Sequence, residues 1–202
     1  MTLETWLLYA LAAIGLSLTP GPNGLLALTH GALYGARRTL ATIFGGLTGF
    51  ALVIGVSLFG IGALLAAASE LLIVLKILGG AYLVFLGIQL VRSEPIALSG
   101  SVSKGSSGRN LYSQGLLSAV SNPKGILFFV AFLPQFVSQQ SSLALQFFIM
   151  AGTFLAIEFV YEFVVASLAD RVKPLLAKAG KRFNYVFGGI FVAIGVLLPF
   201  RG

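Results

Sequence analysis

Six long apolar runs, separated by short polar segments, make up most of this sequence. They cover residues 5–28, 40–68, 71–91, 111–137, 143–169 and 183–200. Each is near or above the roughly 20 residues that a helix needs to cross the hydrocarbon core of a bilayer, and tilt accommodates the excess. We therefore expect an all-α integral membrane protein with six transmembrane helices, and residues 1–202 as a single transmembrane domain.

Composition supports this prediction and narrows the function. Hydrophobic residues make up 57% of the chain and charged residues only 9%, against about a quarter charged in soluble domains. Without cysteine, and with His30 as the single histidine, the chain lacks the usual ligands of a transition-metal site, so neither a metal site nor a cofactor is expected. It has no HExxH or GxSxG motif, so we predict that it is not an enzyme.

The distribution of basic residues predicts the orientation in the membrane. Ten of the thirteen Lys and Arg residues fall in the first, third and fifth connections between the runs, and none falls in the second or fourth. Positively charged connections stay in the cytoplasm, so both termini are predicted to lie outside. The basic residues responsible for the net charge of +7 are then orientation signals that also contact lipid headgroups. No nucleic-acid partner is expected.

The chain also contains two related halves. A Ser- and Gly-rich linker, residues 93–110, separates repeat one (1–92) from repeat two (111–202). At an offset of 101 residues, Pro22-Asn23-Gly24 superposes on Pro123-Lys124-Gly125, and Ser17 superposes on Ser118. Three spans per half is an odd number, so the halves are predicted to be inverted repeats. In secondary transporters of this architecture, interrupted helices mark the substrate site, which points to the first and fourth spans.

The first span is interrupted by Thr19-Pro20-Gly21-Pro22-Asn23-Gly24. Prolines lack an N–H donor and crowd the preceding turn, so helices 1 and 4 are both predicted to break at their proline motifs. Freed backbone groups are tolerable only inside protein or beside a wet cavity. A half-helix restarting near Asn23 would aim free amides at an anionic ligand. The substrate-binding residues predicted in this span are Pro20, Gly21, Pro22 and Asn23.

The fourth span contains Asn122-Pro123-Lys124, the other predicted substrate-binding segment. Lys124 lies about 13 residues from either end of its run, which is roughly 20 Å at the helical rise. A lysine at that depth costs on the order of 3 kcal/mol, so it needs a partner or a function. A buried ion pair with Glu158 remains an alternative to a substrate contact.

Two carboxylates lie in the fifth span, at Glu158 and Glu162. Their spacing of four places them on one face of a helix. A carboxylate in hydrocarbon favours its neutral form, as a proton relay requires, so both are predicted to couple transport to protons.

Several motifs together resemble the LysE/RhtB family of amino-acid exporters. They are Thr19 to Asn23, Gly79 to Gly87 (GGAYLVFLG), Asn122-Pro123-Lys124, and Phe132-Leu133-Pro134-Gln135-Phe136. The resemblance covers nearly the whole chain. It implies a small protein of the bacterial inner membrane that expels amino acids or their derivatives, driven by the proton-motive force. Two positions depart from the family pattern: Val53 replaces a residue that is often polar, and Glu162 is not expected, so the substrate is left open.

The resulting hypothesis is a proton-coupled exporter of small amino acids. The substrate carboxylate would meet Lys124 and the amides near Asn23, and Glu158 would face the amino group. The alternatives are a passive channel and a cation or metal exporter that uses Glu158 and Glu162. A homodimer is an option that the sequence leaves open.

Overall fold

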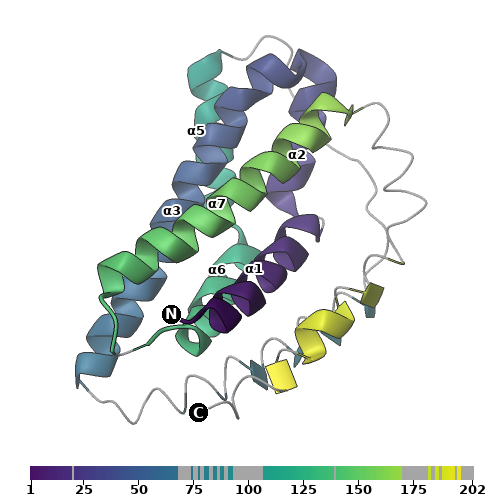
Figure 1. Cartoon of the computed structure of the whole chain (residues 1–202). Coiled ribbons are helices and arrows are strands. Elements are labelled where there is room, and N and C mark those ends of the chain that lie inside the picture. Colours follow the sequence, from purple (N-terminus) through teal and green to yellow (C-terminus); the bar gives the residue numbers. More distant parts are fainter. Residues whose placement is uncertain are drawn as a thin grey trace.

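The computed structural model describes residues 1–19, 21–67, 107–138 and 140–169, with single positions between 74 and 92 and between 182 and 196. All regular elements in these four continuous ranges are helical (Figure 1): α1 (Leu3–Leu18), α2 (Pro22–Tyr34), α3 (Ala36–Ala67), α5 (Gly108–Val120), α6 (Pro123–Phe132), the short 3₁₀ helix η1 (Leu133–Gln135) and α7 (Leu143–Ser167). The third and sixth predicted spans, the linker at 93–110 and the basic segment 170–182 lie largely outside the described residues.

Two of these helices are long and apolar enough to cross a membrane on their own. They are Ala36–Gly60 of α3 and Leu143–Ser167 of α7, each of 25 residues. Two pairs of consecutive helical segments reach the necessary length only in combination. They are α1 with α2, bent by 53°, and α5 with the continuous segment of α6 and η1, bent by 51°. The described residues therefore hold two to four candidate membrane spans.

Local chemistry explains where these helices end. α1 stops at Leu18, two residues before Pro20 in the sequence, and the Thr19 hydroxyl donates to the carbonyl of Gly15 at 2.7 Å. Pro22 occupies the first turn of α2, where its missing N–H costs nothing. Gly35 has a φ of +75° and separates α2 from α3, a conformation open to glycine at little cost.

Helices α3 and α7 cross as an antiparallel pair, and the shorter helices pack around them (Figure 1). Phe44 near the start of α3 contacts Phe159 late in α7, whereas Phe59 near the end of α3 contacts Phe147 early in α7. α1 lies along α7, where the Tyr9 hydroxyl donates to the carbonyl of Met150 at 2.9 Å.

α5 packs against α3 through glycines. A Cβ built on Gly45 would overlap the carbonyl oxygen of Tyr112, and one on Gly115 would overlap that of Thr42. One turn further along both helices, Gly49 faces Ala119, so α3 and α5 run in the same direction. Small residues at such contacts allow the backbone approach that drives helix association in lipid.

The distribution of side chains is that of a membrane protein. Large apolar side chains face outward along α1, α3 and α7, among them Leu3, Leu7, Leu11, Phe44, Leu52, Val56, Phe148 and Val160. Polar side chains are buried instead, including Asn23, His30, Gln146, Glu158 and Glu162. In water such an outer surface would be an aggregation hazard, but in lipid it is the favourable arrangement.

Candidate functional site

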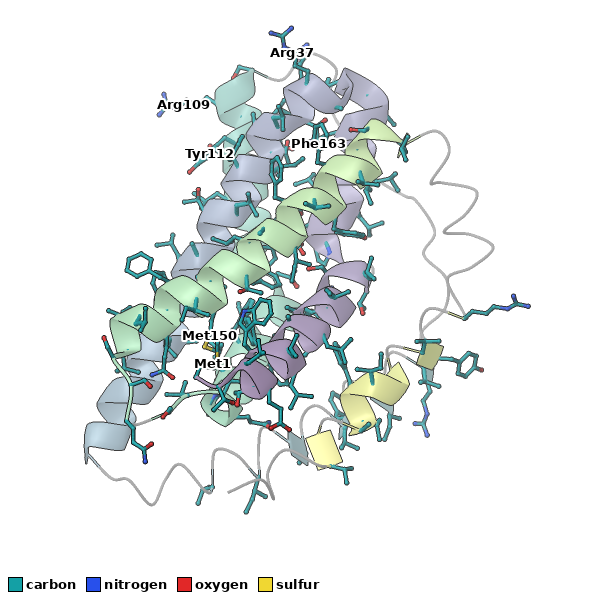
Figure 2. The ribbon with its side chains drawn as sticks, in the orientation of Figure 1. Met1, Arg37, Arg109, Tyr112, Met150 and Phe163 are labelled. Carbon is teal, nitrogen blue, oxygen red and sulfur yellow. The ribbon has the colours of Figure 1, made fainter. Side chains whose placement is uncertain are left out.

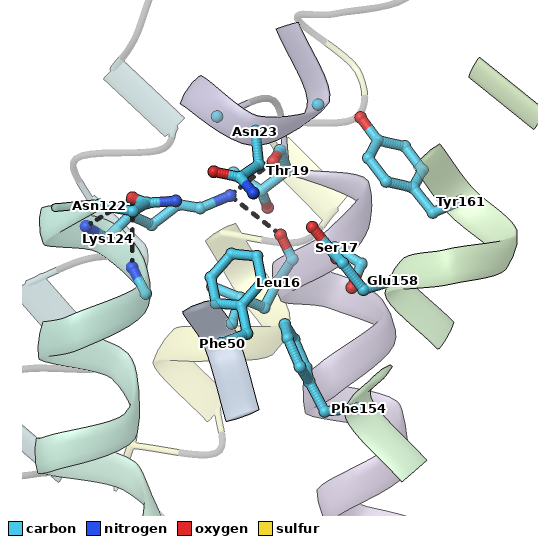
Figure 3. Close-up of a pocket in the computed structure, with 13 residues that line it drawn as sticks. Leu16, Ser17, Thr19, Asn23, Phe50, Asn122, Lys124, Phe154, Glu158 and Tyr161 are labelled. Atoms are coloured by element: carbon cyan, nitrogen blue, oxygen red, sulfur yellow. Dashed lines mark hydrogen bonds between the residues drawn. The ribbon is translucent and has the colours of Figure 1, made fainter. Parts of the chain in front are cut away.

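A pocket lies where the bends between α1 and α2 and between α5 and α6 come together (Figure 3). It is lined by Leu16, Ser17, Thr19, Gly21, Asn23, Gly24, Phe50, Asn122, Lys124, Gly125, Phe154, Glu158 and Tyr161. The lining comes from α1, α2, α3, α6 and α7 with their caps.

Lys124 extends from the first turn of α6 to the end of α1. Its ammonium group donates to the carbonyl oxygen of Thr19 at 2.7 Å and to that of Leu16 at 3.1 Å. Among the described residues its hydrogen bonds thus go to main-chain oxygens rather than to Glu158. Gly21 makes room for this position, because a Cβ there would lie 2.8 Å from the Lys124 nitrogen.

The two helices that begin at the pocket differ in how their first amides are satisfied. Asn122 caps α6, with its side-chain oxygen accepting from the N–H groups of Lys124 at 3.1 Å and Gly125 at 3.3 Å. α2 is preceded by Gly21, which has no side chain to cap it. The N-terminal amides of α2 therefore remain open to an anionic ligand.

Glu158 faces the pocket from α7, beside Ser17 (Figure 3). Both side chains are buried and interact with each other, but within the described part of the chain neither Glu158 Oε2 nor Ser17 Oγ makes a hydrogen bond of good geometry. A buried polar atom left without a good hydrogen bond is costly, so both atoms suit a ligand that donates hydrogen bonds.

Glu162 lies one turn further along α7 and is also buried. Asn23 connects it to the pocket: the Asn23 amide is hydrogen-bonded to Glu162, and the Asn23 oxygen accepts from Ser118 at 2.6 Å.

Aromatic rings close the remaining sides of the pocket. Phe50 and Phe154 form an edge-to-face pair with centroids 5.2 Å apart, and Tyr161 packs against Gly24. The space left open suits about one water molecule. An amino acid would need these side chains to separate.

The structure thus brings together residues that are distant in sequence. Of the predicted site residues, Gly21, Asn23, Asn122, Lys124 and Glu158 line the pocket, and Glu162 lies behind Asn23. Pro22 is exposed in the first turn of α2 and Pro123 opens α6, whereas Pro20 lies outside the described residues. The predicted site residues did not include Ser17, Thr19, Phe50, Phe154 and Tyr161. Of these, Thr19 lies in the proline-interrupted segment of the first span, and Ser17 has the repeat partner Ser118.

Sequence comparison assigns this arrangement to a family. The sequence model of one family, described as "LysE type translocator", matches residues 14–202. The chain belongs to the LysE family of translocators. The resemblance seen in its motifs is confirmed over most of its length.

Named relatives of this LysE-family chain are efflux proteins. It is 32% identical to the homoserine/homoserine lactone efflux protein of Salmonella typhimurium, over 98% of this chain and 97% of that protein. It is 28% identical to the leucine efflux protein of Klebsiella pneumoniae, over 96% of this chain and 93% of that protein. A membrane protein of Vibrio cholerae is 33% identical over 98% of both chains. No solved structure matches the chain.

Proposed function

We propose that this LysE-family protein is a secondary transporter that exports small amino acids or close derivatives across the bacterial inner membrane, in exchange for protons. The observation that carries the proposal is the charge pattern of the pocket. It presents the Lys124 ammonium and the uncapped amides of α2 together with the buried carboxyl group of Glu158. A zwitterionic amino acid has the complementary pair of charges.

Each end of the substrate has a matching set of groups. The α-carboxylate would accept hydrogen bonds from the amides of Asn23 and Gly24 at the start of α2, and would attract the Lys124 ammonium. The α-amino group would donate to Glu158 Oε2 and to Ser17, which make no hydrogen bond of good geometry among the described residues. A ligand with only one of the two charges would leave one set unsatisfied.

The two carboxyl groups of α7 supply a path for protons. Glu158 lies in the pocket and Glu162 lies one turn away behind Asn23. A buried carboxyl group that loses its cationic partner favours protonation, so a proton can take the place of the departing amino group. Export of the substrate and entry of a proton would then alternate at the same site.

The helix directions support six spans in two inverted halves. α3 and α5 run in the same direction, which supports a further span between them, in agreement with the apolar run 71–91 of the sequence. Arg37 and Arg109 lie at one end of the molecule and Met1 lies toward the other (Figure 2). With the basic end in the cytoplasm, the N-terminus is outside, and with six spans so is the C-terminus.

In this proposal the bends beside the pocket are the moving parts. The pocket is nearly filled by its own side chains, so these side chains have to separate before a substrate can enter. Rocking of one half against the other would open the pocket to each side in turn.

Efflux from amino-acid-loaded vesicles tests the proposal. We expect Lys124→Met and Glu158→Gln each to reduce pH-gradient-driven efflux at least tenfold at equal protein content. Glu4→Gln, the same change in the first turn of α1, should leave efflux unchanged. Full efflux by both pocket variants would refute the proposal. A wild-type efflux rate that does not depend on the pH gradient would indicate the passive channel instead.

A further inference from the structure

The end of α1 carries main-chain oxygens that have lost their helical donors. In a continuous helix, the carbonyl of Leu16 would accept from the N–H of residue 20, but residue 20 is proline and has none. Thr19 lies beyond the last residue of the helix and its carbonyl points at Lys124. These oxygens also lie at the negative end of the α1 dipole, which favours a cation.

In the structure the cation at the end of α1 is the ammonium group of Lys124. The Lys124 ammonium has three donors, and two of them go to the carbonyls of Thr19 and Leu16. Ser17, between those two residues, and Glu158 face the same pocket with buried atoms that make no hydrogen bond of good geometry within the described residues. The acceptors in this region therefore exceed what one lysine satisfies.

We infer that the carbonyl end of α1, with Ser17 and Glu158, is a binding site for a primary ammonium group that Lys124 fills in the empty protein and vacates for the amino group of the substrate. This inference rests on the proposed function and adds to it the role of Lys124. Lys124 is a tethered competitor for the amine, and on leaving α1 it becomes available to the substrate carboxylate.

The position of Gly21 makes this exchange feasible. The Lys124 nitrogen lies over Gly21, the residue that precedes the uncapped amides of α2. A small rotation of the side chain thus moves the ammonium from the carbonyl end of one helix to the amide end of the next. A substrate held between them would contact both, with its amino group on α1 and its carboxylate on α2 and Lys124.

The experiment uses the full-length protein in detergent and n-propylamine, which replaces the atoms that Lys124→Ala removes. We expect propylamine to raise the thermal unfolding midpoint of Lys124→Ala at a concentration at least tenfold below that needed for the wild type, because the tethered competitor is gone. 1-Propanol and sodium butyrate, at matched ionic strength, should have no such preference. An equal response of both proteins to propylamine would overturn the inference.

Competition tests whether the substrate uses the same site. Homoserine or leucine that stabilises Lys124→Ala should shift the propylamine titration to higher concentration, and independent binding would contradict the exchange. If neither amino acid stabilises any form of the protein, the proposed substrate class fails, whereas the propylamine result still decides the ammonium site.

A second variant tests the inference if Lys124→Ala does not fold. Lys124→Met fills the side-chain space but leaves the carbonyls without a donor, so methylamine should stabilise it more than it stabilises the wild type. Failure of both variants to fold, even with the amine present throughout purification, would also count against the inference, because the bound amine should replace the missing ammonium.

Discussion

Asn23 and Lys124 each follow the proline that opens a pocket helix. Each side chain contacts the end of the helix that comes before the opposite bend, α5 for Asn23 and α1 for Lys124. Asn23 of α2 accepts from Ser118 near the end of α5, and Lys124 of α6 donates to Leu16 and Thr19 at the end of α1. The positions differ by 101 residues, the offset that relates Ser17 to Ser118. One contact is neutral and the other is charged, so we expect the neutral contact to hold the two bends together and the charged one to bind ligand.

The neutral contact predicts a measurable coupling. Asn23→Ala and Ser118→Ala each remove one partner of the 2.6 Å hydrogen bond, so the double variant should lose less stability than the sum of the two single changes. We expect a coupling energy of about 1 kcal/mol. Chemical unfolding in detergent measures all four proteins, and strict additivity would show that the contact does not contribute.

Glycine is predicted to be required at position 21 because it has no side chain. Its φ of −147° is open to any residue, so Gly21→Ala is not strained, but the new Cβ would lie 2.8 Å from the Lys124 nitrogen. We expect the ammonium to be displaced from α1, with a loss of about 1–2 kcal/mol in unfolding free energy and slower efflux. Gly152→Ala, in α7 with nothing within 4 Å of the new Cβ, is the control. It should change neither the free energy of unfolding nor the rate of efflux.

The contact between α3 and α5 should not tolerate even one methyl group. Gly115→Ala would place a Cβ on the carbonyl oxygen of Thr42, and overpacking of this kind costs about 1–3 kcal/mol. The melting temperature in detergent should fall accordingly. Gly60→Ala, in the same helix pair but with open space around it, should not lower it; equal effects of both changes would contradict the predicted close approach.

The absence of cysteine allows a clean test of orientation. Single cysteines at the exposed positions Thr2 and Gln140 should react in intact cells with a thiol reagent that cannot cross the membrane. Cysteines at Arg37 and Arg109 should react only after the cells are opened. The reverse pattern would invert the predicted orientation.

Much of the helical arrangement follows from sequence patterns with a direct physical cause. Prolines lack a donor, and α2 and α6 both begin at the prolines singled out by the repeat. Charged residues in an apolar run must find a polar environment, and Lys124 and Glu158 do line the same pocket.

Other parts of the site depend on three-dimensional contacts that leave no pattern. The acceptors of Lys124 are main-chain oxygens, which every residue has, so the sequence suggested a carboxylate or a ligand instead. Phe50, Phe154 and Tyr161 are aromatic residues in a chain with many. Asn122 was predicted to bind substrate, a role that stays a prediction, and its side-chain oxygen caps α6.

Proton movement driven by an amino-acid gradient is the decisive test of proton exchange at Glu158. Purified protein is reconstituted in vesicles that enclose a pH-sensitive dye, and an outward gradient of homoserine or leucine is imposed without a pH gradient. We expect wild-type protein to move protons opposite to the amino acid and Glu158→Gln not to do so, with Glu4→Gln behaving as wild type. Amino-acid flux without proton movement in the wild type, or full coupling in Glu158→Gln, would contradict this expectation.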